Sequence, residues 1–311
     1  MIDDDRYARA VLRHTEHVLE LFVGERLINK IFARVFQSHA MGRLVIAHFD
    51  WKAGVGPRPT LASLQAQTGS GRTLAAFIGI AKVARLVSVE PDPTDRRQKF
   101  LVPGPRIVEG LRTWLRHHLE LAHAIGIMPA ECANRLDEDN AYFERFVRAS
   151  IIVIDGVAEA GKRFTQWQWF EDHECGQRIA YALLRAHYQA CLAARTPVDE
   201  ALDLTISGAA VANMLGLSKS HVRNVLNGAE ARGALSHDES RRTMRLTSAF
   251  LHEARDQFVN VLTLMARTHA KAELESGRSP ASASEQVGTR GMTSASAIGN
   301  APPSRSRSRT D

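Results

Sequence analysis

Four polar side chains on one predicted helix could read the edges of nucleic-acid bases. Residues 219–232 place Lys219, Ser220, Arg223 and Asn224 away from the apolar positions of that helix. In the major groove of DNA, arginine can make two hydrogen bonds to guanine, and asparagine can make two to adenine. Any one of these residues alone is better explained as part of a solvated helix face. As a set, they indicate a base-reading helix.

Two pairs of adjacent arginines add the chemistry of phosphate binding. The pairs are Arg96-Arg97 and Arg241-Arg242, and each lies in a polar segment between two short β-like stretches. Guanidinium groups bind phosphate oxygens through charge-assisted hydrogen bonds. A soluble hairpin turn would also explain each pair. Their recurrence at matched places favours a shared anionic partner, which we expect to be DNA.

These residues belong to a pattern that occurs twice in the chain. An offset of 147 residues aligns Thr60 with Ser207 and Gly69 with Gly216. The hydroxyl side chains are candidate N-caps of a short helix, and the glycines lie where a tight turn between helices commonly needs a positive φ. In the second copy another helix begins after Ser218, with apolar residues at the spacing i, i+3, i+4 and i+7. The pattern predicts a helix, a turn and a second helix.

The matching positions of the first copy are less suited to reading bases. They hold Arg72, Thr73 and Ala76, so we expect this copy to bind mainly the DNA backbone. Asp95, next to the first arginine pair, has two equally supported roles. It could orient a neighbouring arginine through a charge-assisted hydrogen bond, or it could form the turn.

The two copies resemble winged helix-turn-helix regulators of the MarR type. Residues 92–97 read DPTDRR, which is similar to the DPxDRR segment of that family's hairpin, and residues 215–235 resemble its recognition-helix pattern. The first copy departs from the family by having Leu86 directly after Arg85, where the pattern has glycine. The resemblance covers about a third of the chain. It implies a second helix in the major groove and hairpin arginines on phosphates or in the minor groove.

Length and composition favour a mainly α chain with more than one domain. The 311 residues are rich in helix-forming types and contain few aromatics. We predict tandem winged helix-turn-helix units with small β-hairpin wings, joined by long amphipathic helices. The predicted long helices run from Tyr7 to Phe36, from Arg106 to Ile125 and from Gln177 to Ala194. The predicted divisions are 1–127 for an N-terminal helix and the first unit (core 40–105), 128–171 for a helical linker, 172–275 for the second unit (core 176–248) with a trailing helix, and 276–311 for a disordered basic tail.

Positive charge is concentrated in the two copies and in the tail. The formal net charge is +6. Residues 58–106 hold eight Lys or Arg against three Asp or Glu, residues 205–248 hold six against three, and the residues from Ser276 hold five against two. Local basic segments of this kind are typical of a phosphate-binding surface. The tail also contains too little apolar surface to fold.

Other kinds of chemistry have little support in the sequence. Cys132, Cys175 and Cys191 show neither a disulfide framework nor the spacing of a structural zinc site. His187 shares a helix face with Cys191, and His173 lies close to Cys175, but we expect ordinary packing rather than a metal site or a thiol sensor. Walker, dinucleotide-binding and nucleophile-elbow motifs do not occur, so we expect neither an enzyme nor a cofactor.

Four aromatic residues close together in the sequence are expected to lie in the core. They are Phe164, Trp167, Trp169 and Phe170. Their alternative role is to line a pocket for a small-molecule effector. The acidic N-terminus has no signal-peptide pattern and no apolar run reaches membrane-spanning length, so we expect a cytoplasmic protein without a membrane partner.

The sequence therefore predicts a transcription regulator that binds double-stranded DNA sequence-specifically. Both a homodimer and a pseudo-dimer formed within one chain fit the repeat. The alternatives are a plasmid-type replication initiator, which would also use tandem winged helices, and an adaptor whose winged helices bind protein.

Overall fold

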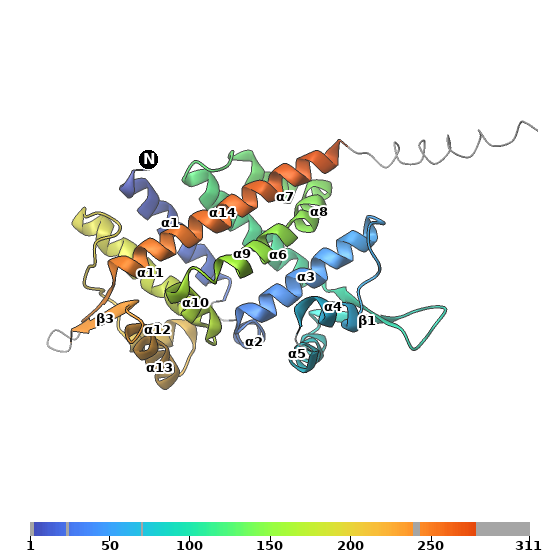
Figure 1. The fold of residues 1–311 in the computed structure, drawn as a ribbon, viewed down its shortest axis with the longest axis horizontal. Coiled ribbons are helices and arrows are strands. Elements are labelled where there is room, and N and C mark those ends of the chain that lie inside the picture. Colours follow the sequence, from blue (N-terminus) through green and yellow to red (C-terminus); the bar gives the residue numbers. More distant parts are fainter. Residues whose placement is uncertain (1–2, 23–24, 70, 239–242, 278–311) are drawn as a thin grey trace, which may run out of the picture.

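The chain is mainly helical in its computed structural model, which describes residues 3–22, 25–69, 71–238 and 243–277 (Figure 1). Within these residues, the strands form two separate two-stranded antiparallel hairpins. The prediction of a mainly α fold with small hairpins is confirmed. In this described part, no helix combines the length and the apolar character that crossing a bilayer requires.

Helices from both halves of the chain build the fold. The first half contributes α1 (Asp4–Glu20), α2 (Arg26–Ile31), α3 (Val35–Lys52), α4 (Leu61–Thr68), α5 (Gly71–Val83), α6 (Pro105–Ala124), α7 (Glu131–Glu138) and α8 (Asn140–Ala149). The second half contributes α9 (Ile151–Ala160), α10 (Thr165–Asp172), α11 (Gly176–Ala194), α12 (Gly208–Leu215), α13 (Lys219–Glu230) and α14 (Ser248–Ser276). The strands are β1 (Val87–Pro91) and β2 (Lys99–Pro103), which follow α5, and β3 (Leu235–Asp238) and β4 (Thr243–Leu246), which follow α13.

Long helices form the body of the molecule. α14 packs on α8, α9 and α10, while α1 packs on α11 and α6 (Figure 1). α14 begins after Thr247, whose hydroxyl accepts the backbone N–H of Phe250. Its spacing of three or four residues puts a set of apolar side chains on one face, and all of them are buried: Phe250, Ala254, Phe258, Leu262 and Met265. Their removal from water stabilises the body.

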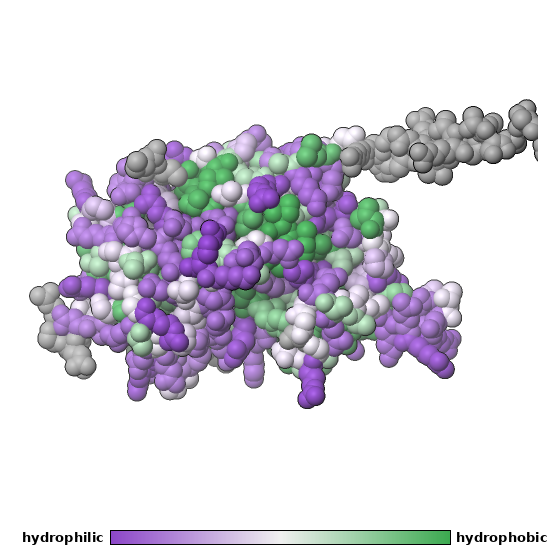
Figure 2. All heavy atoms as spheres, viewed as in Figure 1, coloured by the Kyte–Doolittle hydropathy of each residue, from purple (hydrophilic) through white to green (hydrophobic). Residues whose placement is uncertain are grey.

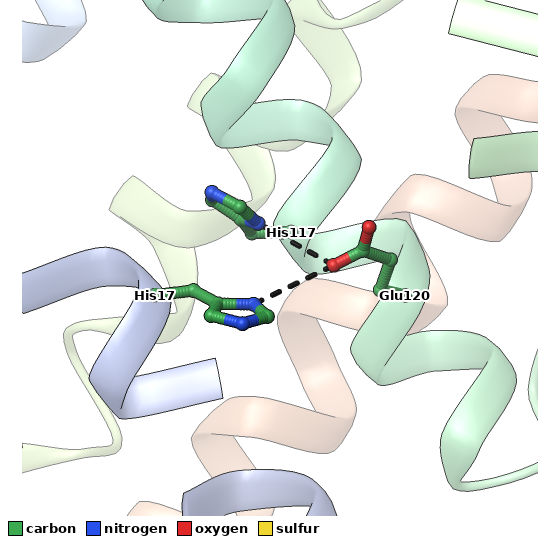
Figure 3. Close-up of side chains that lie close together, drawn as sticks. All are labelled: His17, His117 and Glu120. Carbon is green, nitrogen blue, oxygen red and sulfur yellow. Dashed lines mark hydrogen bonds and ion pairs between the residues drawn. The ribbon is translucent and has the colours of Figure 1, made fainter. Parts of the chain in front are cut away.

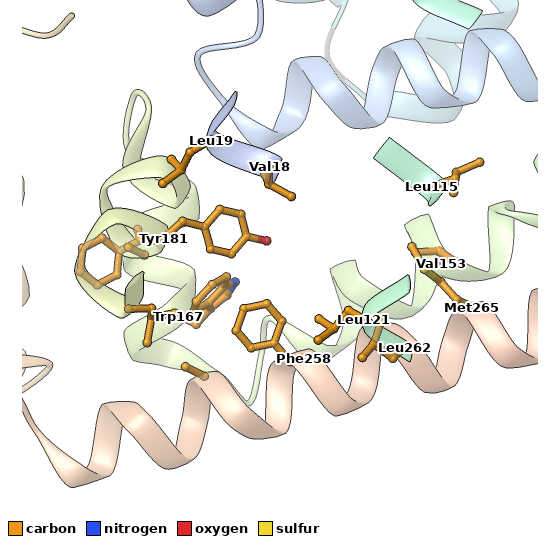
Figure 4. Packing of buried hydrophobic residues seen from close by; sticks show 14 of the residues in the cluster. Val18, Leu19, Leu115, Leu121, Val153, Trp167, Tyr181, Phe258, Leu262 and Met265 are labelled. Carbon is orange, nitrogen blue, oxygen red and sulfur yellow. The ribbon is translucent and has the colours of Figure 1, made fainter. Parts of the chain in front are cut away.

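One continuous hydrophobic cluster joins the two halves of the chain. Val18 and Leu115 from the first half and Trp167 and Tyr181 from the second lie around the same interior space (Figure 4). The cluster crosses the predicted boundaries between units and linker. The division into those units stays a prediction.

The first helix pair, α4 and α5, has the local structure that its sequence predicts. The Thr60 hydroxyl accepts the backbone N–H of Ser63 and so caps α4. Gly69 ends the helix with a φ of 65°, which glycine adopts without steric cost. α5 then buries Leu74, Phe77, Ile78 and Ala81. The predicted cap and the predicted glycine turn are confirmed.

The second helix pair, α12 and α13, repeats this structure. The Ser207 hydroxyl accepts the backbone N–H of Ala210, and Gly216 has a φ of 65°. The Ser218 hydroxyl caps α13 by accepting the backbone N–H of His221. The apolar positions of α13 are buried as predicted: Val222, Val225, Leu226 and Ala229.

Between each helix pair and its hairpin, one residue has a left-handed backbone conformation, with a positive φ. It is Gly233, with a φ of 73°, in the second copy and Arg85, with a φ of 57°, in the first. The residue that follows donates its backbone N–H to the preceding helix in both copies, from Leu86 at 2.8 Å and from Ala234 at 3.0 Å. The first copy therefore keeps the turn without a glycine, at a strain of about 1 kcal/mol.

The N-terminal helix is shorter than predicted. The sequence predicts one helix from Tyr7 to Phe36, but α1 ends at Glu20 and α2 is a separate helix before α3. Glu25 before α2 has φ −90° and ψ 59°, and Phe32 after it has φ −103° and ψ 42°. Both residues lie outside the helical region, so α2 is continuous with neither α1 nor α3. The single-helix prediction is wrong for this reason. The predicted helices 106–125 and 177–194 are confirmed as α6 and α11.

Replacing Gly176 by alanine is expected to lower the free energy of unfolding by about 1–3 kcal/mol. Gly176 is the first residue of α11, and an added Cβ would overlap the carbonyl oxygen of Phe170, so α10 would have to move. Gly79→Ala is the matched control, because a Cβ there meets nothing within 4 Å. Alanine should stabilise α5 by about 1 kcal/mol. Urea unfolding measures both changes, and a Gly176→Ala chain as stable as wild type would contradict the close approach of α10 to α11.

Candidate nucleic-acid interface

The two predicted second helices lie on one side of the molecule. α5 and α13 are at the lower edge of Figure 1, beneath the long helices, and the two hairpins extend toward opposite ends. Figure 2 shows hydrophilic side chains projecting from this edge below α12 and α13. The fold thus brings two repeats that are far apart in the sequence onto a common side.

The outward face of α13 carries all four predicted base-reading residues. Lys219, Ser220, Arg223 and Asn224 are exposed. The Ser220 hydroxyl lies 3.2 Å from the hydroxyl of the capping Ser218. Among the described residues, neither Lys219 nor Arg223 has an acidic partner. The two cations are therefore available to an anionic ligand on this face.

α10 supports the back of α13. The Trp169 indole N–H donates to the Val225 carbonyl at 3.3 Å, and the ring lies against Gly228, where a Cβ would overlap it. The Arg232 guanidinium lies 3.5 Å from the centre of the same ring, where cation–π attraction adds to the packing. Sequence reasoning missed this support. Gly228, a glycine inside an amphipathic helix, is the signal that could have revealed it.

The outward face of α5 is less polar than that of α13. Arg72, Thr73 and Ala76 are exposed, as predicted. The same exposed side of α5 also carries Ile80 and Val83, which are 55% and 87% exposed. This face offers a single cation near its start and apolar surface farther along.

Hydrogen bonds that two aspartates accept order the connection between β1 and β2. Asp92 Oδ1 accepts the backbone N–H of Thr94 at 2.6 Å and that of Asp95 at 3.1 Å. The hydrogen bonds from Thr94 hold the pKa of Asp92 below its ordinary value. Asp95 Oδ1 in turn accepts the backbone N–H of Arg97 at 3.0 Å. Asp95 therefore acts in forming the turn, one of the two roles considered for it.

The first arginine pair lies in this ordered connection. Arg96 and Arg97 are exposed, and in the part of the chain that the structure describes their guanidinium groups make no ion pair. Arg241 and Arg242, the predicted second pair, lie outside the described residues.

Among the described residues, one histidine of α1 and a histidine and a glutamate of α6 lie close enough together to hold a metal ion. His17 Nδ1 and His117 Nδ1 lie 3.6 and 3.4 Å from the same oxygen of Glu120 (Figure 3). Burial lowers the pKa of His117, and neutral imidazole is the form that binds metals. Arg116 bonds the other Glu120 oxygen at 3.2 Å. The same contacts also suit a histidine–carboxylate pair that joins α1 to α6.

The histidine and cysteine pairs noted in the sequence lie at two separate places. Cys175 precedes α11, while His187 and Cys191 are at least twelve residues farther along it, which is about 18 Å. His187 Nε2 lies 2.7 Å from the Val198 carbonyl and can donate its proton there. Burial raises the pKa of the Cys191 thiol to about 11. Packing and backbone hydrogen bonds account for these residues.

The comparisons with known proteins identify no relative. No family model, no curated protein and no solved structure matches this chain.

Proposed function

We propose that this chain binds double-stranded DNA as a transcription regulator, through two winged helix-turn-helix units of the MarR type. The observation that carries the proposal is one local structure present twice. A capped helix, a glycine turn, a second helix and a hairpin recur, and both second helices lie on one side of the body (Figure 1). Two such helices facing the same way suit two successive stretches of major groove.

The exposed side chains support a division of roles between the units. Arg223 and Asn224, near the start of α13, would read base edges in the major groove, with Lys219 and Ser220 beside them. Arg96 and Arg97 would bind phosphates or the minor groove from the first hairpin. The second hairpin is assigned the same role through Arg241 and Arg242.

We also propose that the active form is a pseudo-dimer within one chain, acting in the cytoplasm. The continuous core that joins both halves supports this form. The alternative is a homodimer with four units. The mass of the chain bound to one duplex, measured by sedimentation, distinguishes them, because the proposal requires one chain per site.

Selection of bound duplexes from a random library by the full chain tests the proposal. One enriched sequence is expected. Its affinity should fall about a hundredfold between 50 and 200 mM salt if about four phosphates are neutralised, because binding releases counterions. A library that shows no enrichment, or an affinity that does not change with salt, would refute DNA binding by this basic surface.

A second candidate function is binding to a protein, and the apolar outward face of α5 favours it. Ile80 and Val83 are strongly exposed there, and such surface often marks a protein contact. An adaptor would show no duplex binding at low salt. Selected sites arranged as direct repeats would instead favour a replication initiator.

A further inference from the structure

One histidine of α1 and two residues of α6 direct donor atoms toward a common point between the two helices. Nδ1 of His17 and Nδ1 of His117 face the same carboxylate oxygen of Glu120 (Figure 3). The three residues offer ligand atoms that all lie within 4.8 Å of one another. Two imidazoles and a carboxylate form the ligand set of zinc sites that keep an open position.

The distances between these atoms suit a shared metal ion better than two hydrogen bonds. The Glu120 oxygen lies 3.4 Å from His117 Nδ1 and 3.6 Å from His17 Nδ1, whereas an N–H···O hydrogen bond is usually about 2.7–3.2 Å long. Zinc bonds of 2.0–2.1 Å in a tetrahedron put neighbouring ligand atoms about 3.3–3.4 Å apart. The first distance matches this edge, and the second is only slightly longer.

The second histidine ring is what a simple ion pair does not explain. The rings of His17 and His117 lie side by side, with 4.8 Å between their centroids. One protonated histidine would suffice to pair with Glu120, and two protonated rings at this distance would repel each other. A divalent cation bound by both neutral rings and the carboxylate accounts for all three side chains.

Rigid helices hold the three ligands in place. His117 and Glu120 are three residues apart on α6 and therefore share one face of that helix. α1, which packs on α6, carries His17. One turn earlier on α1, His14 Nδ1 lies 3.2 Å from the carbonyl oxygen of His117 and can donate its proton there. The two helices are thus fixed to each other beside the site, which keeps its geometry ready for a metal ion.

An outer hydrogen bond orients the carboxylate ligand. Arg116 donates to the other oxygen of Glu120 at 3.2 Å, which leaves the first oxygen directed at the two histidines. Outer partners of this kind orient metal ligands and are part of a metal site. Arg116 also forms an ion pair with Asp137 at 3.6 Å, and this second carboxylate offsets the positive charge of the guanidinium.

The exposure of the ligands allows a metal ion to enter from solvent. The side chains of His17 and Glu120 are 35% and 36% exposed, while that of His117 is 9% exposed. A water molecule can therefore take the fourth position, as it does in zinc sites with three protein ligands. Magnesium and calcium prefer oxygen ligands, whereas two imidazoles favour zinc and related transition metals.

We propose that His17, His117 and Glu120 bind a zinc ion that ties α1 to α6, with water at the fourth position. α1 also packs on α11, so the ion holds the N-terminal helix where it contacts helices of both halves of the chain. The site is independent of the proposed DNA-binding function.

Zinc titration of the full chain, first freed of metal by a chelator, tests the proposal in competition with a chromophoric zinc indicator. Wild type is expected to bind one zinc ion per chain at this site. His17→Gln and Glu120→Gln each remove one ligand, and each should weaken zinc binding at least about a hundredfold, since losing an outer partner alone costs about 10–100-fold. His252→Gln is the matched control, because it removes an exposed histidine that lies 3.4 Å from the carboxylate of Asp199. It should bind zinc as wild type does.

Thermal melting shows whether the variants are folded and whether zinc binds the folded chain. Every chain should melt in a single transition in the presence of chelator, because the side chains of His17 and Glu120 are partly exposed. Zinc should raise the melting temperature of wild type and of His252→Gln, since a ligand that binds only the folded state stabilises it. It should leave the melting temperatures of His17→Gln and Glu120→Gln unchanged.

Hydrogen exchange locates the bound ion. Zinc should slow the exchange of amides in α1 and α6 of wild type and have no such effect in His17→Gln. The proposal is overturned if either ligand variant, folded, binds zinc as tightly as wild type, which would indicate adventitious surface binding, or if zinc leaves exchange in α1 and α6 unaltered. A chain that meets these expectations but binds no duplex would refute the proposed function and leave the zinc site standing.

Discussion

The full chain carrying Arg223→Ala and Asn224→Ala is expected to bind the selected duplex more weakly by about 2–6 kcal/mol. Both side chains are exposed on α13, whose buried face and Ser218 cap they do not contribute to. Each lost bidentate base contact should cost about 1–3 kcal/mol. Sequence preference should relax at a few positions of one half-site, while affinity for random DNA should change less. Competition between selected and random duplexes measures the preference.

The Arg96→Ala and Arg97→Ala chain is the matched control. It also removes two exposed side chains, but both are cations and they lie in the β1–β2 connection. Affinity should fall for most sequences and the dependence on salt should become shallower, while sequence preference persists. A folded Arg223→Ala and Asn224→Ala chain that keeps full preference would show that α13 is not the reading helix.

Glu171→Gln is expected to remove a pH-dependent loss of stability of about 3 kcal/mol. Burial raises the pKa of Glu171 from 4.5 to about 7 in the folded chain, so the folded state holds a proton that the unfolded state releases. The stability from this proton is fully present below pH 4.5 and is lost as the pH rises through about 7. The glutamine variant cannot titrate. Relative to it, wild type should become less stable over this range, as urea unfolding at several pH values can show.

The buried histidines do not obscure that comparison. Burial lowers the pKa of His14 and lowers that of His118 to about 4, so their contribution to stability is lost as the pH falls, in wild type and variant alike. Glu159→Gln is the control, because this carboxylate is 73% exposed beside Lys162. It should follow wild type. A difference between wild type and Glu171→Gln that stays constant with pH would rule out the raised pKa.

The sequence predicted those parts of the candidate site that depend on residues close together in the chain. The caps at Thr60 and Ser218 bond an amide three residues away, and the glycine turns depend on a single φ. The buried face of α13 follows from spacing within one helix. Each of these features is determined within about one helical turn, which is why both copies could be recognised.

Contacts between distant segments could not be predicted in the same way. Nothing near Trp169 in the sequence indicates that it lies against Gly228, and Arg178 meets Asn29 across 149 residues. An amphipathic pattern does not show where α1 and α2 end, and a cavity of about 580 Å³ is lined by residues from both halves of the chain. Tertiary packing determines these features.

The continuous core has a consequence for how the two units can diverge. In a symmetric dimer one gene encodes both helix-turn-helix copies, so every substitution appears twice. Here each copy is encoded separately, so a substitution in one leaves the other unchanged. The two copies already differ, since one exposes Arg223 and Asn224 and the other exposes Ile80 and Val83. A DNA site bound by both copies would be asymmetric, and the chain would bind it in one orientation.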